Sequence, residues 1–187
     1  LMLTDERARG YDPLFKVNPP LRTEADVEAV RAGLEDGTID IVATDHAPHA
    51  REDKDCEWDA AAFGMTGLET ALSVVQATMV DTGRMTWADV ARVMSTNPAH
   101  IGRIAEGDLP QGRPIAVGEP GNLVLVDPAA RTVVDPRKQG TTSDNSPFRG
   151  AELPGRVVAT FLRGRATVLD GQAVAPAGSP APREVTR

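Results

Sequence analysis

The chain has 187 residues, of which 41% are hydrophobic and 25% charged, with a formal net charge of −7. This length allows one domain or parts of two, and the composition is typical of a globular protein without a basic stripe for nucleic acid. No apolar run approaches the roughly 18 residues that a membrane-spanning helix requires. The single cysteine, Cys56, excludes an internal disulfide. Together with a start that lacks the regions of a secretory signal, it favours a cytoplasmic protein.

The first part of the chain, residues 1–22, has weak periodicity and ends in Lys16-Val17-Asn18-Pro19-Pro20-Leu21-Arg22. Two consecutive prolines remove two backbone donors and fix both φ angles at about −65°. Such a stiff segment can hold Asn18 against a target. On the residues alone, the simpler interpretation is a rigid linker.

Thr23 then has the features of a helix N-cap, because Asp26 follows three residues later. Gly37 is suited to ending this helix. Between them, apolar residues recur at helical spacing: Val27, Val30 and Leu34.

A short buried strand is predicted over residues 39–44, where β-branched residues lie between Gly37 and Pro48. Asp45, His46 and His49 follow its end. In sheets and barrels of parallel strands, ligands and catalytic groups lie at the carboxyl ends of the strands. One carboxylate and two imidazoles at this point favour metal-assisted hydrolysis.

An aspartate after a strand can also cap a helix or form an Asx turn. No helical pattern starts directly after Asp45, because Pro48 and a polar run to Asp59 follow, so the capping interpretation is weaker here. A catalytic zinc ion needs about three protein ligands, and Asp45 is therefore at most one ligand among several from elsewhere.

Three more helices are predicted, two of them beginning with a capping box. The first box pairs Thr66 with Glu69 and the second pairs Thr86 with Asp89, while Asn97-Pro98 opens the third helix as N-cap and N1. The expected apolar faces of the first two are Leu68, Leu72 and Val75, and Val90, Val93 and Met94.

From residue 110 onward, turn signals are dense and the apolar runs shorten to strand length. The sequence predicts turns at Arg163-Gly164 and Asp170-Gly171. Strands are expected over residues 123–126, 132–134, 157–162 and 166–169, which makes an all-β segment joined to an α/β one. Residues 175–187 are rich in Pro, Ala and Gly and are predicted to be disordered.

Six stretches of the chain, taken in order, resemble the dihydroorotases of the amidohydrolase superfamily. The resemblance extends over nearly the whole chain except the tail. The forms Asn-Pro-Pro-Leu-Arg and Thr-Asp-His-Ala-Pro-His favour dihydroorotase over allantoinase and dihydropyrimidinase. The stretches are residues 16–22, 43–49, 63–70, 95–99, 121–125 and 146–150.

This resemblance implies an α/β fold, namely the C-terminal part of a metal-dependent (β/α)8 amidohydrolase barrel plus part of a small β-sandwich domain. Residues 1–103 would be the last βα units of the barrel, with residues 39–45 as its eighth strand. Residues 104–174 would be the C-terminal strands of the sandwich, and residues 175–187 a disordered tail.

The implied activity is the zinc-dependent, reversible hydrolysis of (S)-dihydroorotate to N-carbamoyl-L-aspartate in pyrimidine biosynthesis. By resemblance, Asp45 is both a metal ligand and the general base, and Asn18 and His49 bind the substrate. Phe63 and Gly64 would offer main-chain groups to the pyrimidine ring. His46 is expected to have a structural role, orienting the strand end by a hydrogen bond.

The family's other metal ligands are a His-x-His pair, a bridging acid or carboxylated lysine, and two further histidines. This chain has only His46, His49 and His100, the last expected at the surface or at a helix cap. The resemblance therefore implies an incomplete piece whose one or two zinc ions are mostly held elsewhere.

The expected partners are a small-molecule substrate and either a second copy of the protein or aspartate transcarbamoylase. Two alternatives stay open: an inactive subunit that scaffolds aspartate transcarbamoylase, and another cyclic amidohydrolase.

Overall fold

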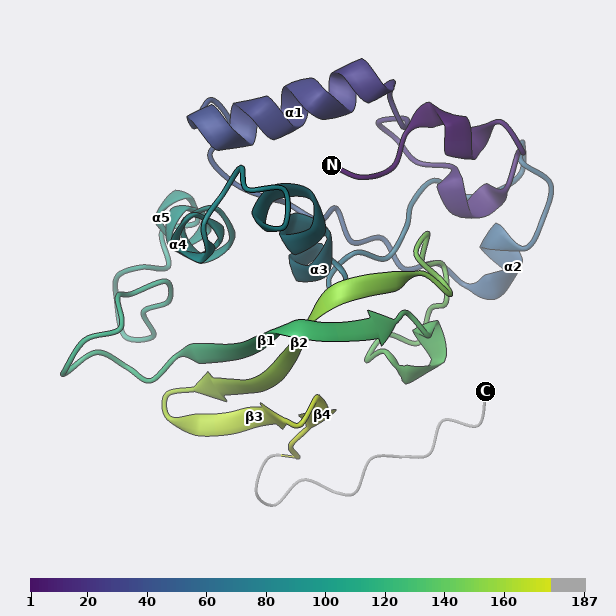
Figure 1. Cartoon of the computed structure of the whole chain (residues 1–187). Coiled ribbons are helices and arrows are strands. Elements are labelled where there is room, and N and C mark those ends of the chain that lie inside the picture. Colours follow the sequence, from purple (N-terminus) through teal and green to yellow (C-terminus); the bar gives the residue numbers. More distant parts are fainter. Residues whose placement is uncertain (176–187) are drawn as a thin grey trace.

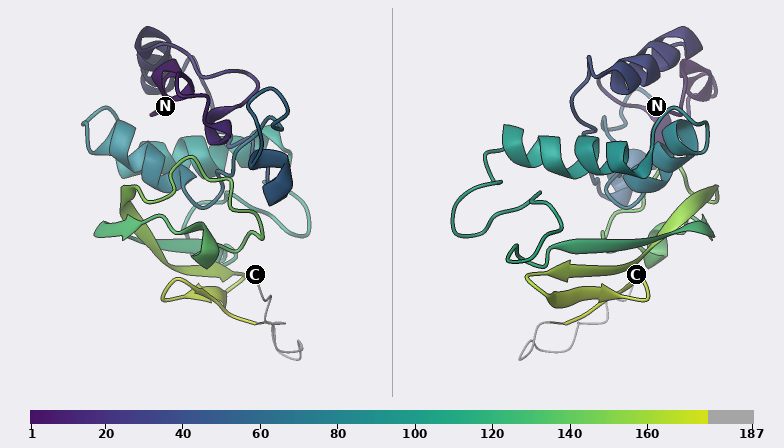
Figure 2. Two further views of the ribbon diagram at one scale, coloured as in Figure 1. Left: turned by 90° about the vertical axis from the view of Figure 1, so that its right-hand side faces the viewer. Right: turned by 60° about the vertical axis from the view of Figure 1, so that its left-hand side comes forward.

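Helices and a sheet are stacked in three layers in the computed structural model, which describes residues 1–175 (Figures 1 and 2). Helix α1 (Glu24–Asp36) and the N-terminal segment form one outer layer, and an antiparallel sheet forms the other. The helical runs that contain α3, α4 and α5 lie between them. The disordered tail is predicted over residues 175–187, of which residues 176–187 lie outside the described part.

Helix α1 begins and ends as the sequence predicts. The Thr23 side chain accepts a hydrogen bond from Asp26 N, and the Asp26 carboxylate accepts one from Thr23 N at 3.1 Å. Gly37 ends the helix with a φ of 84°, in the left-handed region that glycine adopts without steric cost. Val30, expected on the buried face, is instead 41% exposed.

Helix α3 (Ala71–Val75) continues as a π-helical segment, Gln76–Val80. The predicted capping box of Thr66 and Glu69 is wrong, because the Thr66 backbone amide and the Glu69 carboxylate both bind a distant loop instead. Thr66 N donates to Asn145 O at 3.1 Å, and Glu69 Oε1 accepts from Gly140 N at 2.7 Å. Leu68 precedes the helix and is 63% exposed.

The next helical run combines α4 (Trp87–Ala91), a π-helical segment (Arg92–Thr96) and α5 (Asn97–Ile101). Its start confirms the predicted capping box of Thr86 and Asp89. The prediction that Asn97 caps a separate helix is wrong, because Asn97 has helical dihedrals within a continuous run. Its side chain donates to Asp40 O at 2.9 Å and so holds the 39–44 segment.

The hydrophobic core lies where α1 and these two runs meet. Its buried members are Leu34, Val75, Met79, Met85, Val90 and Val93. Ile39 and Val42 pack against this cluster from the segment that was expected to be a strand.

Residues 39–44 form no regular strand, which corrects the expectation of an eighth barrel strand over residues 39–45. A strand requires a neighbouring strand to complete its hydrogen-bond ladder, and the named strands among residues 1–175 all belong to the C-terminal sheet. The segment instead has single tertiary bonds, such as Val42 N to Val93 O at 3.0 Å. An isolated parallel bridge joins His46 to Met65.

The sheet has four antiparallel strands in the order β1-β2-β3-β4: β1 (Leu123–Val133), β2 (Glu152–Leu162), β3 (Arg165–Leu169) and β4 (Gln172–Ala173). Two strands are predicted over residues 123–126 and 132–134, whereas β1 is a single strand that includes both ranges. It is irregular, because its register against β2 shifts twice. The short helices are Asp5–Ala8, Pro13–Phe15, α2 (Arg51–Lys54) and Pro136–Lys138.

Both predicted turns are confirmed, since each occupies the left-handed region at two consecutive residues. The φ angles are 53° and 76° at Arg163-Gly164, and 50° and 74° at Asp170-Gly171.

Candidate functional site

His49 lies beside Phe63 and Gly64, although these residues come from separate loops. His49 Nε2 is 2.8 Å from Phe63 O, within hydrogen-bonding distance. A neutral imidazole can donate from Nε2 when the proton is there. Three of the residues that the sequence assigns to substrate binding are thus brought together.

Gly64 allows this close approach. Its φ is 139°, and a Cβ at this position would lie 2.8 Å from His49 Nε2 and 2.6 Å from the Ala47 Cβ. Any larger residue would therefore collide with the loop that carries His49 and would also adopt a strained backbone.

The segment that carries Asn18 lies against the same loop. Gly64 N donates to Lys16 O at 3.0 Å, and the Lys16 ammonium is 4.6 Å from the centroid of the Phe63 ring. Asn18 itself is exposed, and its side chain makes no hydrogen bond within the described residues. Its amide is therefore available to a ligand.

His46 has the structural role predicted for it. Its Nδ1 accepts hydrogen bonds from Gly67 N at 3.0 Å and from Leu68 N at 3.2 Å. Because Nδ1 accepts, the proton of the neutral ring resides on Nε2. The ring thereby joins the end of the 39–45 segment to the chain that leads into α3.

Asp45 is exposed and has a φ of 46°, in the left-handed region. Within residues 1–175 its carboxylate has no hydrogen bond or ion pair, so it is free to bind a cation or accept a proton. Over the same range, no group of three or more His, Cys, Asp or Glu residues could hold a metal ion. The described residues therefore fit one ligand of a metal site, and they do not form a complete site.

Two buried lysines hold the surrounding loops, and no sequence pattern distinguishes them from other lysines. Lys16 Nζ donates to Trp58 O at 2.6 Å and to Asp59 O at 3.1 Å. Lys54 Nζ donates to Ala62 O at 2.9 Å. Burial, and secondly the charge of Lys16, lower the pKa of Lys54. Both ammonium groups thus satisfy backbone carbonyls, a structural use of charge.

Two polar residues of the C-terminal segment, Ser143 and Asn145, are buried under the His49 loop. His49 N donates to Ser143 Oγ at 3.1 Å, and Ser143 Oγ donates to His49 O at 2.7 Å. Asn145 Nδ2 donates to Ala47 O at 2.9 Å. They adjoin the 146–150 stretch, for which the resemblance implies no role.

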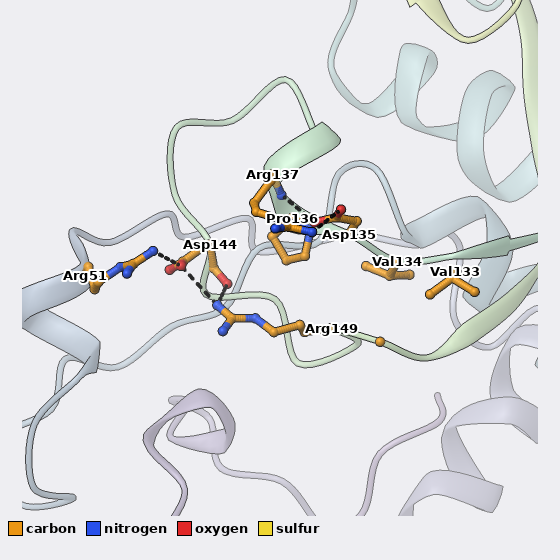
Figure 3. A pocket seen from close by; sticks show the side chains of 9 residues that line it. Arg51, Val133, Val134, Asp135, Pro136, Arg137, Asp144 and Arg149 are labelled. Carbon is orange, nitrogen blue, oxygen red and sulfur yellow. Dashed lines mark hydrogen bonds and ion pairs between the residues drawn. The ribbon is translucent and has the colours of Figure 1, made fainter. Parts of the chain in front are cut away.

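Beside this cluster is a surface hollow of about 440 Å³ (Figure 3). Arg51 and Arg149 both reach the Asp144 carboxylate, at 2.9 Å and 3.1 Å. On its other side, Arg137 pairs with Asp135 at 2.9 Å and lowers the pKa of that carboxyl to about 2. These guanidinium groups are paired with carboxylates, so the hollow is not an open anion site.

None of the helices within residues 1–175 has the length and apolarity needed to cross a bilayer.

Residues 16–167 match the amidohydrolase family, and the chain belongs to this family. Members of the superfamily are typically metal-dependent enzymes. The L-hydantoinase (dihydropyrimidinase) from Arthrobacter aurescens superposes with a TM-score of 0.84 at 30% identity, over 92% of this chain and 38% of that protein. The predicted class, a mixed α/β part of a barrel enzyme, is confirmed.

Within this family the chain is similar to dihydroorotases. It is 64% identical over 172 residues to the dihydroorotase of Streptomyces coelicolor. This alignment covers 92% of this chain and 39% of the relative. It is 59% identical over 178 residues to that of Leifsonia xyli, covering 95% and 40%. The chain thus spans about two fifths of the length of these relatives, and the expected domain limits at residues 103 and 174 stay predictions.

Proposed function

We propose that this chain is the C-terminal part of a dihydroorotase, which opens the cyclic amide of dihydroorotate to give N-carbamoyl-aspartate and closes it again. The observation that carries this proposal is the 64% identity to a dihydroorotase, which extends over 92% of the chain. The same segment is only 30% identical to the hydantoinase, although the folds superpose well. The sequence similarity therefore favours dihydroorotate over hydantoin as the substrate.

In the proposed reaction, Asp45 acts as the general base. Water attacks the ring carbonyl carbon while the Asp45 carboxylate accepts the water's proton. The carbon–nitrogen bond then breaks, and Asp45 returns that proton to the leaving nitrogen. This role is supported by the exposure of Asp45 and by its lack of a competing partner within the described residues.

Asp45 would also be a ligand of the metal, which we propose to be zinc. A bound zinc ion lowers the pKa of its water toward about 7 and so supplies hydroxide at neutral pH. The remaining ligands would come from outside this chain, because its described residues offer no cluster of three.

Substrate recognition is assigned to Asn18, His49, Phe63 and Gly64. The exposed amide of Asn18 can donate and accept hydrogen bonds, as a cyclic amide requires. The bond between His49 and Phe63 O holds the imidazole beside the backbone of Gly64. These groups would bind the ring while Asp45 accepts the proton of the water that attacks its carbonyl carbon.

The whole enzyme is proposed to work in the cytoplasm, where Cys56 stays reduced. Its partners would be the small-molecule substrate and a second copy of itself or aspartate transcarbamoylase. An inactive scaffold would not need a carboxylate at position 45, so the presence of Asp45 favours the enzyme.

The test compares Asp45→Asn with wild type in the full-length protein, using dihydroorotate, hydantoin and allantoin as substrates. Loss of the general base should lower kcat by about 10²–10⁴-fold. Asp40→Asn is the matched control, because Asp40 is an exposed carboxylate on the same segment. A kcat for Asp45→Asn above about a tenth of the wild-type value would refute the assignment.

Asn18→Ala and His49→Ala separate binding from metal retention. Both should raise KM for dihydroorotate and leave zinc content, measured by elemental analysis, unchanged. Loss of zinc in His49→Ala would instead make His49 a metal ligand.

A further inference from the structure

We propose that Asn145 and Ser143 form a clasp that positions the substrate-binding loops, so that residues outside the barrel segment determine substrate affinity. This inference rests on the proposed function. The clasp consists of these two side chains and the backbone groups that they bind in the loops 45–49 and 63–66. Asn145 is 1% exposed and Ser143 is 7% exposed, so neither side chain is available to bind substrate directly.

The Asn145 amide joins the two loops to each other. Its Nδ2 carries two hydrogens, and it donates to Ala47 O at 2.9 Å and to Gly64 O at 3.2 Å. Both donors are therefore used, one on each loop. Asn145 O also accepts from Thr66 N at 3.1 Å, which fixes the second loop at a further point.

Ser143 holds His49 at both of its backbone polar groups. The hydroxyl oxygen accepts from His49 N at 3.1 Å, and the hydroxyl has two acceptors within donating distance, His49 O at 2.7 Å and Asn145 Oδ1. The Asn145 Oδ1 contacts the same hydroxyl and lies 3.4 Å from His49 N. The backbone from which the imidazole extends is thus fixed by a buried hydrogen-bond network.

Fixing the backbone fixes the imidazole, because the ring is held at its other end by Phe63 O. The gap between the loops is already closed by Gly64, where no Cβ fits. A small movement of either loop would therefore change the distance between His49 and the Gly64 backbone. Displacements of about 1 Å in an active site can cost on the order of 10²-fold in rate.

The experiment measures Asn145→Ala, Asn145→Asp and Ser143→Ala in the full-length enzyme. Each should lower kcat/KM for dihydroorotate by roughly 10- to 100-fold, mainly through KM, as expected for a displaced binding group. Asn145→Asp keeps the shape and the acceptor oxygen but turns the donor into an anion facing two carbonyls. It should be at least as impaired as Asn145→Ala.

Asn122→Ala is the matched control. Asn122 also joins two loops through both ends of its amide, donating to Pro110 O at 2.9 Å and accepting from Arg163 N at 2.8 Å. It directly precedes β1, whose opposite end, at Val133, lines the hollow together with Arg51. Its loss should lower the melting temperature to a similar extent and leave kcat/KM within about 2-fold of wild type, since distant sites act independently.

A double-mutant cycle distinguishes positioning from general destabilisation. If Asn145 acts through His49, adding Asn145→Ala to His49→Ala should cost less than about 3-fold, because coupled residues are not additive. Full additivity of the two changes would overturn the proposal, as would an Asn145→Ala variant whose kcat/KM falls no further than that of Asn122→Ala.

Hydrogen exchange tests the clasp independently of the substrate. Amides of Ala47, His49 and residues 64–66 should exchange faster in Asn145→Ala and not in Asn122→Ala, and unchanged exchange would refute the clasp. If wild type hydrolyses hydantoin in place of dihydroorotate, the proposed function fails. The same variants measured on hydantoin then decide the role of Asn145.

Discussion

Gly64→Ala is the substitution for which the structure gives the most definite expectation. The new Cβ would lie 2.6 Å from the Ala47 Cβ and 2.8 Å from His49 Nε2, at a backbone φ of 139°. An unfavourable backbone conformation costs about 1–3 kcal/mol, and overpacking costs about 1–3 kcal/mol more. The free energy of unfolding of the full-length enzyme should therefore fall by about 2–6 kcal/mol.

The Ala47 Cβ is fixed to its backbone, whereas the His49 ring can rotate. We therefore expect the ring to leave Phe63 O, and KM for dihydroorotate should rise by at least about tenfold, which corresponds to about 1.4 kcal/mol. Chemical denaturation and steady-state kinetics measure the two effects. Gly10→Ala is the control, because a Cβ there meets nothing within 4 Å and no positive φ is involved. A Gly64→Ala variant indistinguishable from Gly10→Ala in both assays would show that the described loop packing is wrong.

Three further predictions concern stability, pH and the isolated chain. Thr86→Ala removes a capping box and should destabilise the protein by about 0.5–2 kcal/mol in chemical denaturation; no change would mean that the cap is dispensable. Arg137 lowers the pKa of Asp135 from 3.8 to about 2. Asp135 therefore contributes stability above pH 3.8 that is lost as the pH falls toward 2. The stability difference between wild type and Asp135→Asn should vanish over that interval, and a difference that persists at pH 2 would contradict the assignment. The chain expressed alone with added zinc should not hydrolyse dihydroorotate, because a catalytic zinc site needs about three protein ligands; measurable turnover would refute the incomplete-site argument.

The features that the sequence predicts correctly are those decided by neighbouring residues. The capping boxes at Thr23 and Thr86 close over three residues, so their side chains find their partners within the same turn. The turn at Asp170-Gly171 depends on two consecutive residues that tolerate a positive φ. In each case no distant group competes for the same hydrogen bonds.

The errors occur where distant residues provide the partners. Thr66 has the sequence context of a cap, yet its backbone amide binds Asn145 and its predicted partner Glu69 binds Gly140. Residues 39–44 have the composition of a buried strand, but a ladder needs a second strand that the described residues do not provide. Local patterns cannot reveal such long-range competition.

For the candidate site, the motif resemblance identified Asn18, His49, Phe63 and Gly64 as a group, and the structure places the last three in contact. It did not identify Ser143 or Asn145, because a buried Ser or Asn has no sequence pattern that distinguishes it from a turn residue. Only the burial of their polar atoms shows that they must be bonded to something.

The loop 140–146 therefore stabilises the segment that is predicted to belong to the barrel, although in sequence it lies within the predicted β segment. Gly140 binds Glu69, Asp144 pairs with Arg51, and Asn145 joins two loops of the site. The ion pair is exposed on the arginine side and contributes little on its own, whereas the buried amide network is costly to break. A domain limit drawn at residue 103 would separate His49 from the groups that fix its backbone. Truncation there should consequently loosen the substrate loops even if every residue of the barrel segment were retained.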